Sequence, residues 1–242
     1  SDFINANDVP GLVDGSERRY IATQGPLDET TADFWRMVWE QDVCCVLMLA
    51  RCEENGVDKC AQYWPPPGNT ADYGGLFVQT VTVEDGRMLT VRELDVTDAA
   101  TGRMRRVVQF HFTGWPDHGV PEDTQVFLDM ARMADEANVS RGPLVVHCSA
   151  GLGRSGTFCI IHSVDEKSRQ LRAATPGADP SVNLAELIVA MRRSRPNMVQ
   201  SKEQLEYCYR VISELAGNRP VDAHHSAYRN FGALVAQLNQ QS

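Results

Sequence analysis

The chain has 242 residues, a net charge of −9 and a hydrophobic content of 43%. This length allows one large domain with a sizeable core, or two small domains. The acidic balance argues against a general nucleic-acid or membrane binder but is compatible with a local basic pocket, and no apolar run approaches the length of a membrane span.

Hydrophobic periodicity places most strands in the first half of the chain and most helices in the second. Residues 30–41 fit a helix, and Thr30 with Asp33 resembles a capping pair at its start. Strands are predicted at 43–49, 76–83, 88–94, 106–112 and 143–147, and helices at 123–137 and near 155–171, 181–193, 201–216 and 228–238. This order predicts an α+β (mixed α/β) domain with a central, highly twisted sheet flanked by helices.

The cysteines show no disulfide or zinc pattern. Their number is odd, and no pair of Cys-x-x-Cys motifs is present. We therefore expect reduced thiols, as in a cytosolic or nuclear protein. His224 and His225 have no other metal-ligand spacing around them, which favours a solvated pair over a metal site.

The stretch "VVHCSAGLGRSGTF" (145–158) contains the clearest chemical signal. A buried strand ends at Cys148, and small residues and glycines then lead into helix-compatible sequence near Ser155. Backbone N–H groups of such a loop can turn inward to form an anion nest, to which the helix N-terminus adds its positive end. Arg154 supplies a planar fork that matches two phosphate oxygens. An electropositive hollow favours a thiolate, so Cys148 is expected to be a nucleophile aimed at phosphorus, while His147 orients the loop.

The same stretch resembles the HCxxGxxR signature of the cysteine-dependent protein tyrosine phosphatases. Other motifs resemble that family in the same order along residues 2–216: "INAN" (4–7), "YIATQGPL" (20–27), "DFWRMVWEQ" (33–41), "KCAQYWP" (59–65), "FHFTGWPDHGVP" (110–121) and "QSKEQ" (200–204). The resemblance implies the tyrosine-specific catalytic domain, with a twisted mixed sheet and helices on both faces. It also implies that Cys148 is the nucleophile and that no metal or organic cofactor is needed.

Further roles follow from this resemblance. Asp117, on a closing loop anchored by Trp115 and Pro116, is expected to be the general acid and then the base for the hydrolytic water. Ser155 is expected to bind the thiolate, with helix N-capping as the structural alternative. Gln200 and Gln204 are expected to position the water. The expected phosphate and substrate contacts are Ser149, Ala150, Gly151, Leu152, Gly153, Arg154, Asp117, His118, Gln200 and Gln204.

Several residues outside these motifs have two possible readings or a place near the site. Glu54 and Lys59 flank a predicted hairpin turn, and the resemblance brings these positions toward the active site; a surface charge pair is the alternative. Asn197 is expected at the pocket gateway, and Cys60 beneath the site as a packed thiol. A solvated face is the favoured reading of the basic cluster Arg192, Arg193 and Arg195.

The resemblance also fixes the expected organisation of the chain. Residues 1–218 are expected to form the catalytic domain, and residues 219–242 a tail whose helix is expected to dock on the domain, with partner binding as the alternative. In the family, a Lys-Asn-Arg-Tyr segment, whose tyrosine stacks on the substrate ring, comes before the position that corresponds to residue 1 here. Either the chain is a fragment or its cleft is built differently. The expected partners are phosphotyrosine-containing proteins, with no nucleic acid and no membrane span, and the domain is expected to be a monomer in the cytoplasm.

Two other functions compete with the tyrosine phosphatase. One is a phosphotyrosine-binding module without turnover, which the presence of Cys148, Arg154, Asp117 and Gln200 disfavours. The other is a dual-specificity or phosphoinositide phosphatase. The loop between Cys148 and Arg154 lacks extra basic residues, and the chain is long for the small dual-specificity type.

Overall fold

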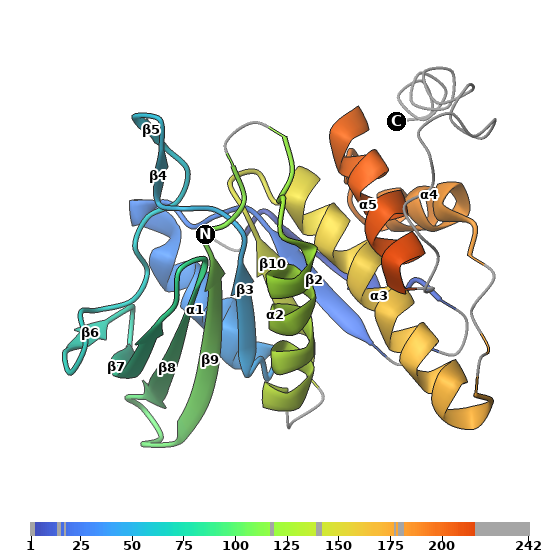
Figure 1. Cartoon of the computed structure of the whole chain (residues 1–242). Helices are drawn as coiled ribbons and strands as arrows, with labels where there is room; N and C mark the ends of the chain where they lie inside the picture. Colours follow the sequence, from blue (N-terminus) through green and yellow to red (C-terminus); the bar gives the residue numbers. More distant parts are fainter. Residues whose placement is uncertain are drawn as a thin grey trace.

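A mixed eight-stranded sheet forms the centre of the computed structural model, which describes residues 3–13, 16, 18–116, 119–138, 142–176, 178 and 182–215 (Figure 1). Over these residues the strand order is β1-β2-β10-β3-β9-β8-β7-β6. Strands β2, β10, β3 and β9 run parallel, and the outer pairs are antiparallel. The bounds are β1 (Ala6–Pro10), β2 (Arg19–Thr23), β3 (Cys45–Met48), β6 (Thr70–Asp72), β7 (Leu76–Asp85), β8 (Leu89–Asp98), β9 (Met104–Phe112) and β10 (Leu144–His147).

Helices cover both faces of this sheet. A one-turn 3-10 helix (Asp28–Thr30) leads into α1 (Thr31–Glu40), which packs on one face around Phe34 and Trp35. The other face is covered by α2 (Thr124–Ala137), α3 (Gly153–Ala174), α4 (Leu184–Ser194) and α5 (Lys202–Leu215). A separate hairpin, β4 (Glu53–Glu54) and β5 (Val57–Asp58), projects at the top of Figure 1.

The structure confirms the predicted α+β class and the helices and strands predicted between residues 30 and 215. It also shows errors. Strand β2 lies between β1 and β10, second from one edge of the sheet, but its five residues carry no alternation that predicts a strand. The expected capping pair at Thr30 is wrong, because its hydroxyl accepts from the backbone N–H of Leu27 instead. The expected tail helix lies outside the described residues.

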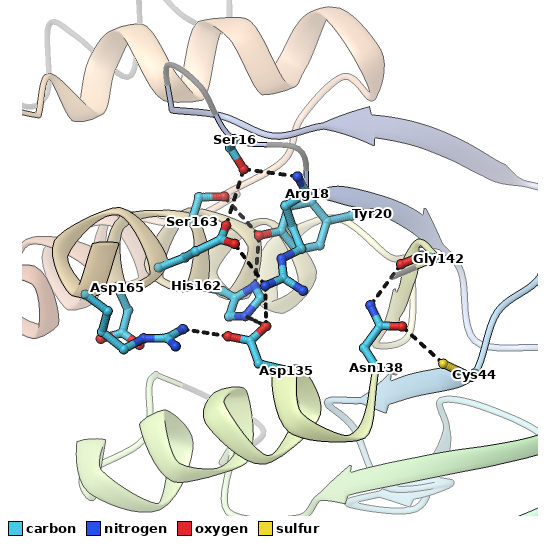
Figure 2. A network of polar contacts seen from close by, with 12 residues as sticks. Ser16, Arg18, Tyr20, Cys44, Asp135, Asn138, Gly142, His162, Ser163 and Asp165 are labelled. Carbon is cyan, nitrogen blue, oxygen red and sulfur yellow. Dashed lines mark hydrogen bonds and ion pairs between the residues drawn. The ribbon is translucent and has the colours of Figure 1, made fainter. Parts of the chain in front are cut away.

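A polar network ties β2, α2 and α3 together beneath the sheet (Figure 2). Asp135 accepts from His162 at 2.9 Å and forms ion pairs with Arg18 and Arg169. The Tyr20 hydroxyl lies 2.8 Å from the other ring nitrogen of His162. Burial raises the pKa of Asp135, but these donors lower it more, to about 2. Charged hydrogen bonds therefore join β2, α2 and α3, which are distant from one another in the sequence.

The topology brings several connections to one edge of the sheet. Strands β10, β3 and β9 are parallel, so their carboxyl ends meet at the same edge. The segment from β10 to α3 and the β4–β5 hairpin both lie there, at the top of Figure 1. Among the described residues, no helix combines the length and apolarity that a membrane crossing requires.

Candidate active site

The segment from Cys148 to Arg154 has its carbonyl groups bound by residues around it. The carbonyl of Ser149 accepts from the N–H of Gly25 at 2.8 Å. The carbonyls of Ala150 and Gly151 each accept from Arg195 at 3.0 Å. The carbonyl of Leu152 accepts from backbone N–H groups, at 2.9 Å and 3.3 Å. Four successive carbonyls are thus directed away from the loop.

The amide groups of this loop therefore point inward. In a trans peptide the N–H lies opposite the carbonyl of the preceding residue. The N–H groups of residues 150–153 must then point to the side that these carbonyls leave. Within the described part of the chain, no hydrogen bond uses the N–H groups of residues 149–154 as donors. Such an array, followed by the N-terminus of α3 at Gly153, has the arrangement of backbone donors that anion sites use.

Two glycines make this close packing sterically feasible. Gly151 has φ +71°, and a Cβ there would lie 2.0 Å from the carbonyl oxygen of Thr23. At Gly153, a Cβ would lie 2.7 Å from Nε2 of Gln204 and 3.0 Å from Oε1 of Gln200. The loop therefore lies against β2 on one side and against both glutamines on the other.

Cys148 and Ser155 lie together in this cradle. The Cys148 side chain is 5% exposed, at the end of β10. The Ser155 hydroxyl is fully buried and lies 3.5 Å from the Cys148 sulfur, within hydrogen-bonding range for sulfur. The alternative helix-capping role of Ser155 is wrong, because α3 begins at Gly153 and its N-cap residue is Leu152.

His147 is fully buried and binds the loop from behind. Its Nδ1 donates to the carbonyl of Cys148 at 3.2 Å, and its Nε2 lies 2.8 Å from the Tyr63 hydroxyl. Burial lowers the pKa of His147 to about 4, so the ring is neutral near pH 7. The histidine positions the backbone of the loop and lies outside the anion cradle.

The guanidinium of Arg154 is held by the β4–β5 hairpin. Its two terminal nitrogens bind the two carboxylate oxygens of Glu54, at 2.6 Å and 2.7 Å. The same nitrogens also donate to the carbonyls of Leu49 at 3.1 Å and Pro116 at 3.3 Å. Among the described residues none accepts from Nε. A bidentate phosphate would therefore meet the Nε–Nη2 edge, with the long bond to Pro116 released.

Glu54 reaches Arg154 because of a tight turn. Asn55 and Gly56 both have positive φ, +51° and +76°, which a two-residue hairpin with the sheet's twist requires. Glu54 is only 6% exposed, so the interpretation of this carboxylate as part of a surface pair is wrong. Lys59 follows the hairpin, where its backbone N–H donates to the carbonyl of Cys52 at 2.7 Å.

The two glutamines are linked to each other beside the loop. Oε1 of Gln204 accepts from the N–H of Gln200 at 2.8 Å. Gln200 precedes α5, whereas Gln204 lies in its first turn. Their amides nevertheless meet at Gly153, as the distances above show.

With this geometry in place, known proteins can be compared. A profile described as protein-tyrosine phosphatase matches residues 1–214. This chain belongs to the protein-tyrosine phosphatase family. Receptor-type tyrosine-protein phosphatase alpha of Mus musculus is 39% identical over 235 residues, covering 96% of this chain and 26% of that protein. Tyrosine-protein phosphatase 2 of Dictyostelium discoideum is 42% identical over 217 residues, covering 88% of this chain and 55% of that protein. The chain thus spans only part of these relatives.

Membership of this family confirms the resemblance found in the sequence, and with it the class of enzyme and the mixed, helix-flanked sheet. Within this phosphatase domain, two of the expected site residues, Asp117 and His118, lie outside the described residues. Their flanks are described. Trp115 is 3% exposed, and its Nε1 donates to the carbonyl of Gly119 at 3.1 Å. Both ends of the short segment are therefore joined by one hydrogen bond.

The basic cluster on α4 gives the largest correction. We expected a solvated face, but Arg195 is 4% exposed and also donates to Oδ1 of Asn7 at 2.6 Å. Arg192 donates to the carbonyls of Met198 and Val199, both at 2.9 Å. Only Arg193 is exposed. Arg192 and Arg195 therefore bind backbone carbonyls within the domain, and sequence periodicity gave no sign of these contacts.

The structure also describes Asn197, Cys60 and the other cysteines. Asn197 is exposed and has φ +63°, in the turn between α4 and α5. Cys60 is buried, and burial raises the pKa of its thiol. All seven cysteines are free thiols. Across the described ranges, no cluster of three or more histidine, cysteine or acidic residues could hold a metal ion, and His224 and His225 lie outside these ranges.

Proposed function

We propose that this domain hydrolyses phosphotyrosine in proteins through a cysteinyl-phosphate intermediate. The observation that carries the proposal is the loop whose four carbonyls are bound outward around a buried cysteine. Inward N–H groups stabilise the equatorial phosphate oxygens, and the Nε–Nη2 edge of Arg154 adds the cationic fork. Cys148 is the nucleophile that these groups surround.

In the first step, the Cys148 thiolate attacks phosphorus and forms the S–P bond as the bond from phosphorus to the tyrosine oxygen breaks. Asp117, as a carboxylic acid, gives its proton to the leaving phenolate. In the second step, a water oxygen attacks phosphorus, Asp117 takes the water's proton, and the S–P bond breaks. The products are tyrosine, inorganic phosphate and the regenerated thiolate, to which Ser155 donates a hydrogen bond.

Gln200 and Gln204 are assigned to the second step. Their side chains lie against Gly153 at the loop that binds the phosphate. Each amide offers a donor NH2 group and an acceptor oxygen, and both are needed to hold a water in line with phosphorus. The Oε1 of Gln204 already binds the N–H of Gln200, which fixes the two relative to each other.

We also propose that the substrates are phosphotyrosine-containing proteins and that the domain acts in the cytoplasm as a monomer. Seven free thiols support a reducing compartment. The neutral side chains between Cys148 and Arg154 support a monoester substrate over a highly charged lipid headgroup.

The test is a rate comparison on matched phosphotyrosine, phosphoserine and phosphothreonine peptides, with Cys148→Ser as the blank. Turnover of phosphotyrosine alone, abolished by Cys148→Ser, is expected. Asp117→Ala should slow substrates with poor leaving groups most. Equal turnover of the three peptides would refute tyrosine selectivity, and residual turnover near wild type in Cys148→Ser would refute the covalent mechanism.

A further inference from the structure

A buried chain of side chains runs from strand β8 to the back of the cysteine loop. Arg92 Nη1 donates to Oε1 of Gln109 at 2.9 Å. Nε2 of Gln109 donates to the Tyr63 hydroxyl at 2.8 Å. Tyr63 lies 2.8 Å from Nε2 of His147, whose Nδ1 contacts the Cys148 carbonyl at 3.2 Å. Gln109, Tyr63 and His147 are fully buried, so water does not relax their geometry.

The groups at the two ends of this series of hydrogen bonds determine which atom donates and which accepts at every step. Arginine has only donors, so the oxygen of Gln109 must face Arg92 and its NH2 group must face Tyr63. The Tyr63 oxygen then accepts, and its single proton is available for His147. At the far end the Cys148 carbonyl can only accept, so Nδ1 of His147 must carry the ring proton. Both ends therefore require the same tautomer, with Nε2 as acceptor.

The alternative direction is disfavoured by the same contacts. If Nε2 carried the proton, Nδ1 would present a lone pair to the carbonyl oxygen 3.2 Å away. Tyr63 would then have to donate to the sulfur of Met48, at 3.9 Å, a weak acceptor. A neutral ring is expected, because burial lowers the pKa of His147 to about 4.

Arg92 is held firmly at the start of the chain. It lies directly opposite Gln109 in the pairing of β8 with β9. Its guanidinium stacks over the Trp64 ring, 4.5 Å from the centroid, and its Nη1 lies 3.3 Å from Nδ1 of His111. Nε2 of His111 in turn donates to the carbonyl of Ala50 at 2.9 Å. One guanidinium thus orients two buried histidines.

We propose that Arg92 and Gln109 are positioning residues for the phosphatase reaction, which set the tautomer of His147 and so keep its Nδ1–H bonded to the carbonyl of Cys148. This bond directs the carbonyl away from the anion cradle and compensates its negative end beside the sulfur. From Gln109 the effect reaches Cys148 through three buried hydrogen bonds, and from Arg92 through one more, without any contact with substrate. The proposal rests on Cys148 being the nucleophile.

The sharpest test is a variant that reverses the donor and acceptor roles of Tyr63 and His147. In Gln109→Glu, a carboxylate accepts from both Arg92 and Tyr63, so Tyr63 can no longer donate to His147. The ring proton should move from Nδ1 to Nε2. Gln109→Met removes the amide that directs the Tyr63 proton to His147, so the ring proton should be shared between Nδ1 and Nε2. Gln79→Glu, on the exposed face of β7, controls for added charge.

The readout is nitrogen NMR of histidine-labelled protein, with the His147 signals assigned by their loss in His147→Gln. Nitrogens that carry a proton and nitrogens that do not have well-separated shifts. Alkylation of Cys148 by iodoacetamide at pH 6 is measured in parallel. In Gln109→Glu it should slow about tenfold, the effect of one lost hydrogen bond of about 1.4 kcal/mol. Gln79→Glu should stay within twofold of wild type, and the rate of Gln109→Met should lie between those of wild type and Gln109→Glu.

Either of two results would overturn the proposal: Nδ1 keeping its proton in Gln109→Glu, or Gln109→Met slowing alkylation as much as Gln109→Glu. If Gln109→Glu does not fold, Arg92→Met and Arg92→Lys replace it. Lysine keeps a donor and should preserve the tautomer, whereas methionine should mix the two; identical spectra would refute the relay. Because the tautomer is read without turnover, an inactive protein with the expected tautomer would count against the proposed function alone.

Discussion

Arg195 provides the most direct test of how the loop is built. Replacement by methionine keeps most of the side-chain volume but removes three hydrogen bonds: two to the carbonyls of Ala150 and Gly151, and one to Asn7. The matched control is Arg193→Met, two residues earlier in the last turn of α4, where the side chain is exposed. Any effect of lost positive charge alone should appear equally in both variants.

The expected loss of stability follows from these contacts. Hydrogen bonds to charged groups contribute about 1.5–3 kcal/mol each, and part of this is offset because a guanidinium no longer has to be buried. The acceptors left behind are neutral, so the net loss should be near 3 kcal/mol. For a domain of this size, that corresponds to a fall in Tm of about 6–12 °C. Arg193→Met should change the free energy of unfolding by less than about 0.5 kcal/mol.

Arg195→Met should also lower catalytic activity, because this arginine orients two carbonyls of the loop. Without Arg195 the two carbonyls are free to rotate, and the N–H groups of Gly151 and Leu152 rotate with them. Removing one preorganised donor costs about 10²–10³ in rate, so kcat/KM should fall at least about 100-fold. Para-nitrophenyl phosphate hydrolysis and urea unfolding, on both variants, measure the two effects. A fall of less than threefold in kcat/KM for Arg195→Met would refute the claim that this arginine orients the anion cradle.

Two further predictions concern the hairpin and the buried histidines. Glu54→Gln should lower kcat/KM for an aryl phosphate about tenfold, because an amide NH2 would face the donors of Arg154. Glu53 is exposed, so Glu53→Gln should leave kcat/KM unchanged. Equal kcat/KM values for the two variants would contradict this prediction. Burial lowers the pKa of His147 and His111 to about 4, below the ordinary value near 6.5, so the folded state resists protonation. Stability should be fully present above about pH 6.5 and fall as the pH drops toward 4, by about 2 kcal/mol per histidine between pH 7 and 5. Urea unfolding at pH 7 and 5 measures this fall in the free energy of unfolding, and His111→Gln should remove about half of it. A free energy of unfolding that did not change between these pH values would contradict the prediction.

Local patterns were enough to identify the elements that carry the chemistry. The buried strand before Cys148, the glycines after it and the helix that follows all depend on steric and hydrogen-bonding preferences of neighbouring residues. The order of motifs along the chain then pointed to the phosphatase family, and the profile match confirmed it. The Asn55-Gly56 turn was likewise readable, because its positive φ angles are a local requirement.

Errors arose where a residue's partner is distant in sequence. Arg195 looked like part of a solvated basic face, yet its partners Asn7 and Gly151 lie 188 and 44 residues away. Strand β2 carries no alternation because it is covered on both faces, so only its neighbours in the sheet identify it.

The fold class, the glycine loop after Cys148 and the family could be predicted from the amino-acid sequence, because each is encoded in short-range preferences and ordered motifs. The groups that hold this loop are visible only in the folded structure: the guanidinium of Arg195, the carboxylate of Glu54 and the hydrogen-bonded side chains from Arg92 to His147. Their hydrogen bonds are directional and span the sheet, and the burial that strengthens them exists only once the strands and helices have packed. Such contacts have no period or spacing along the chain.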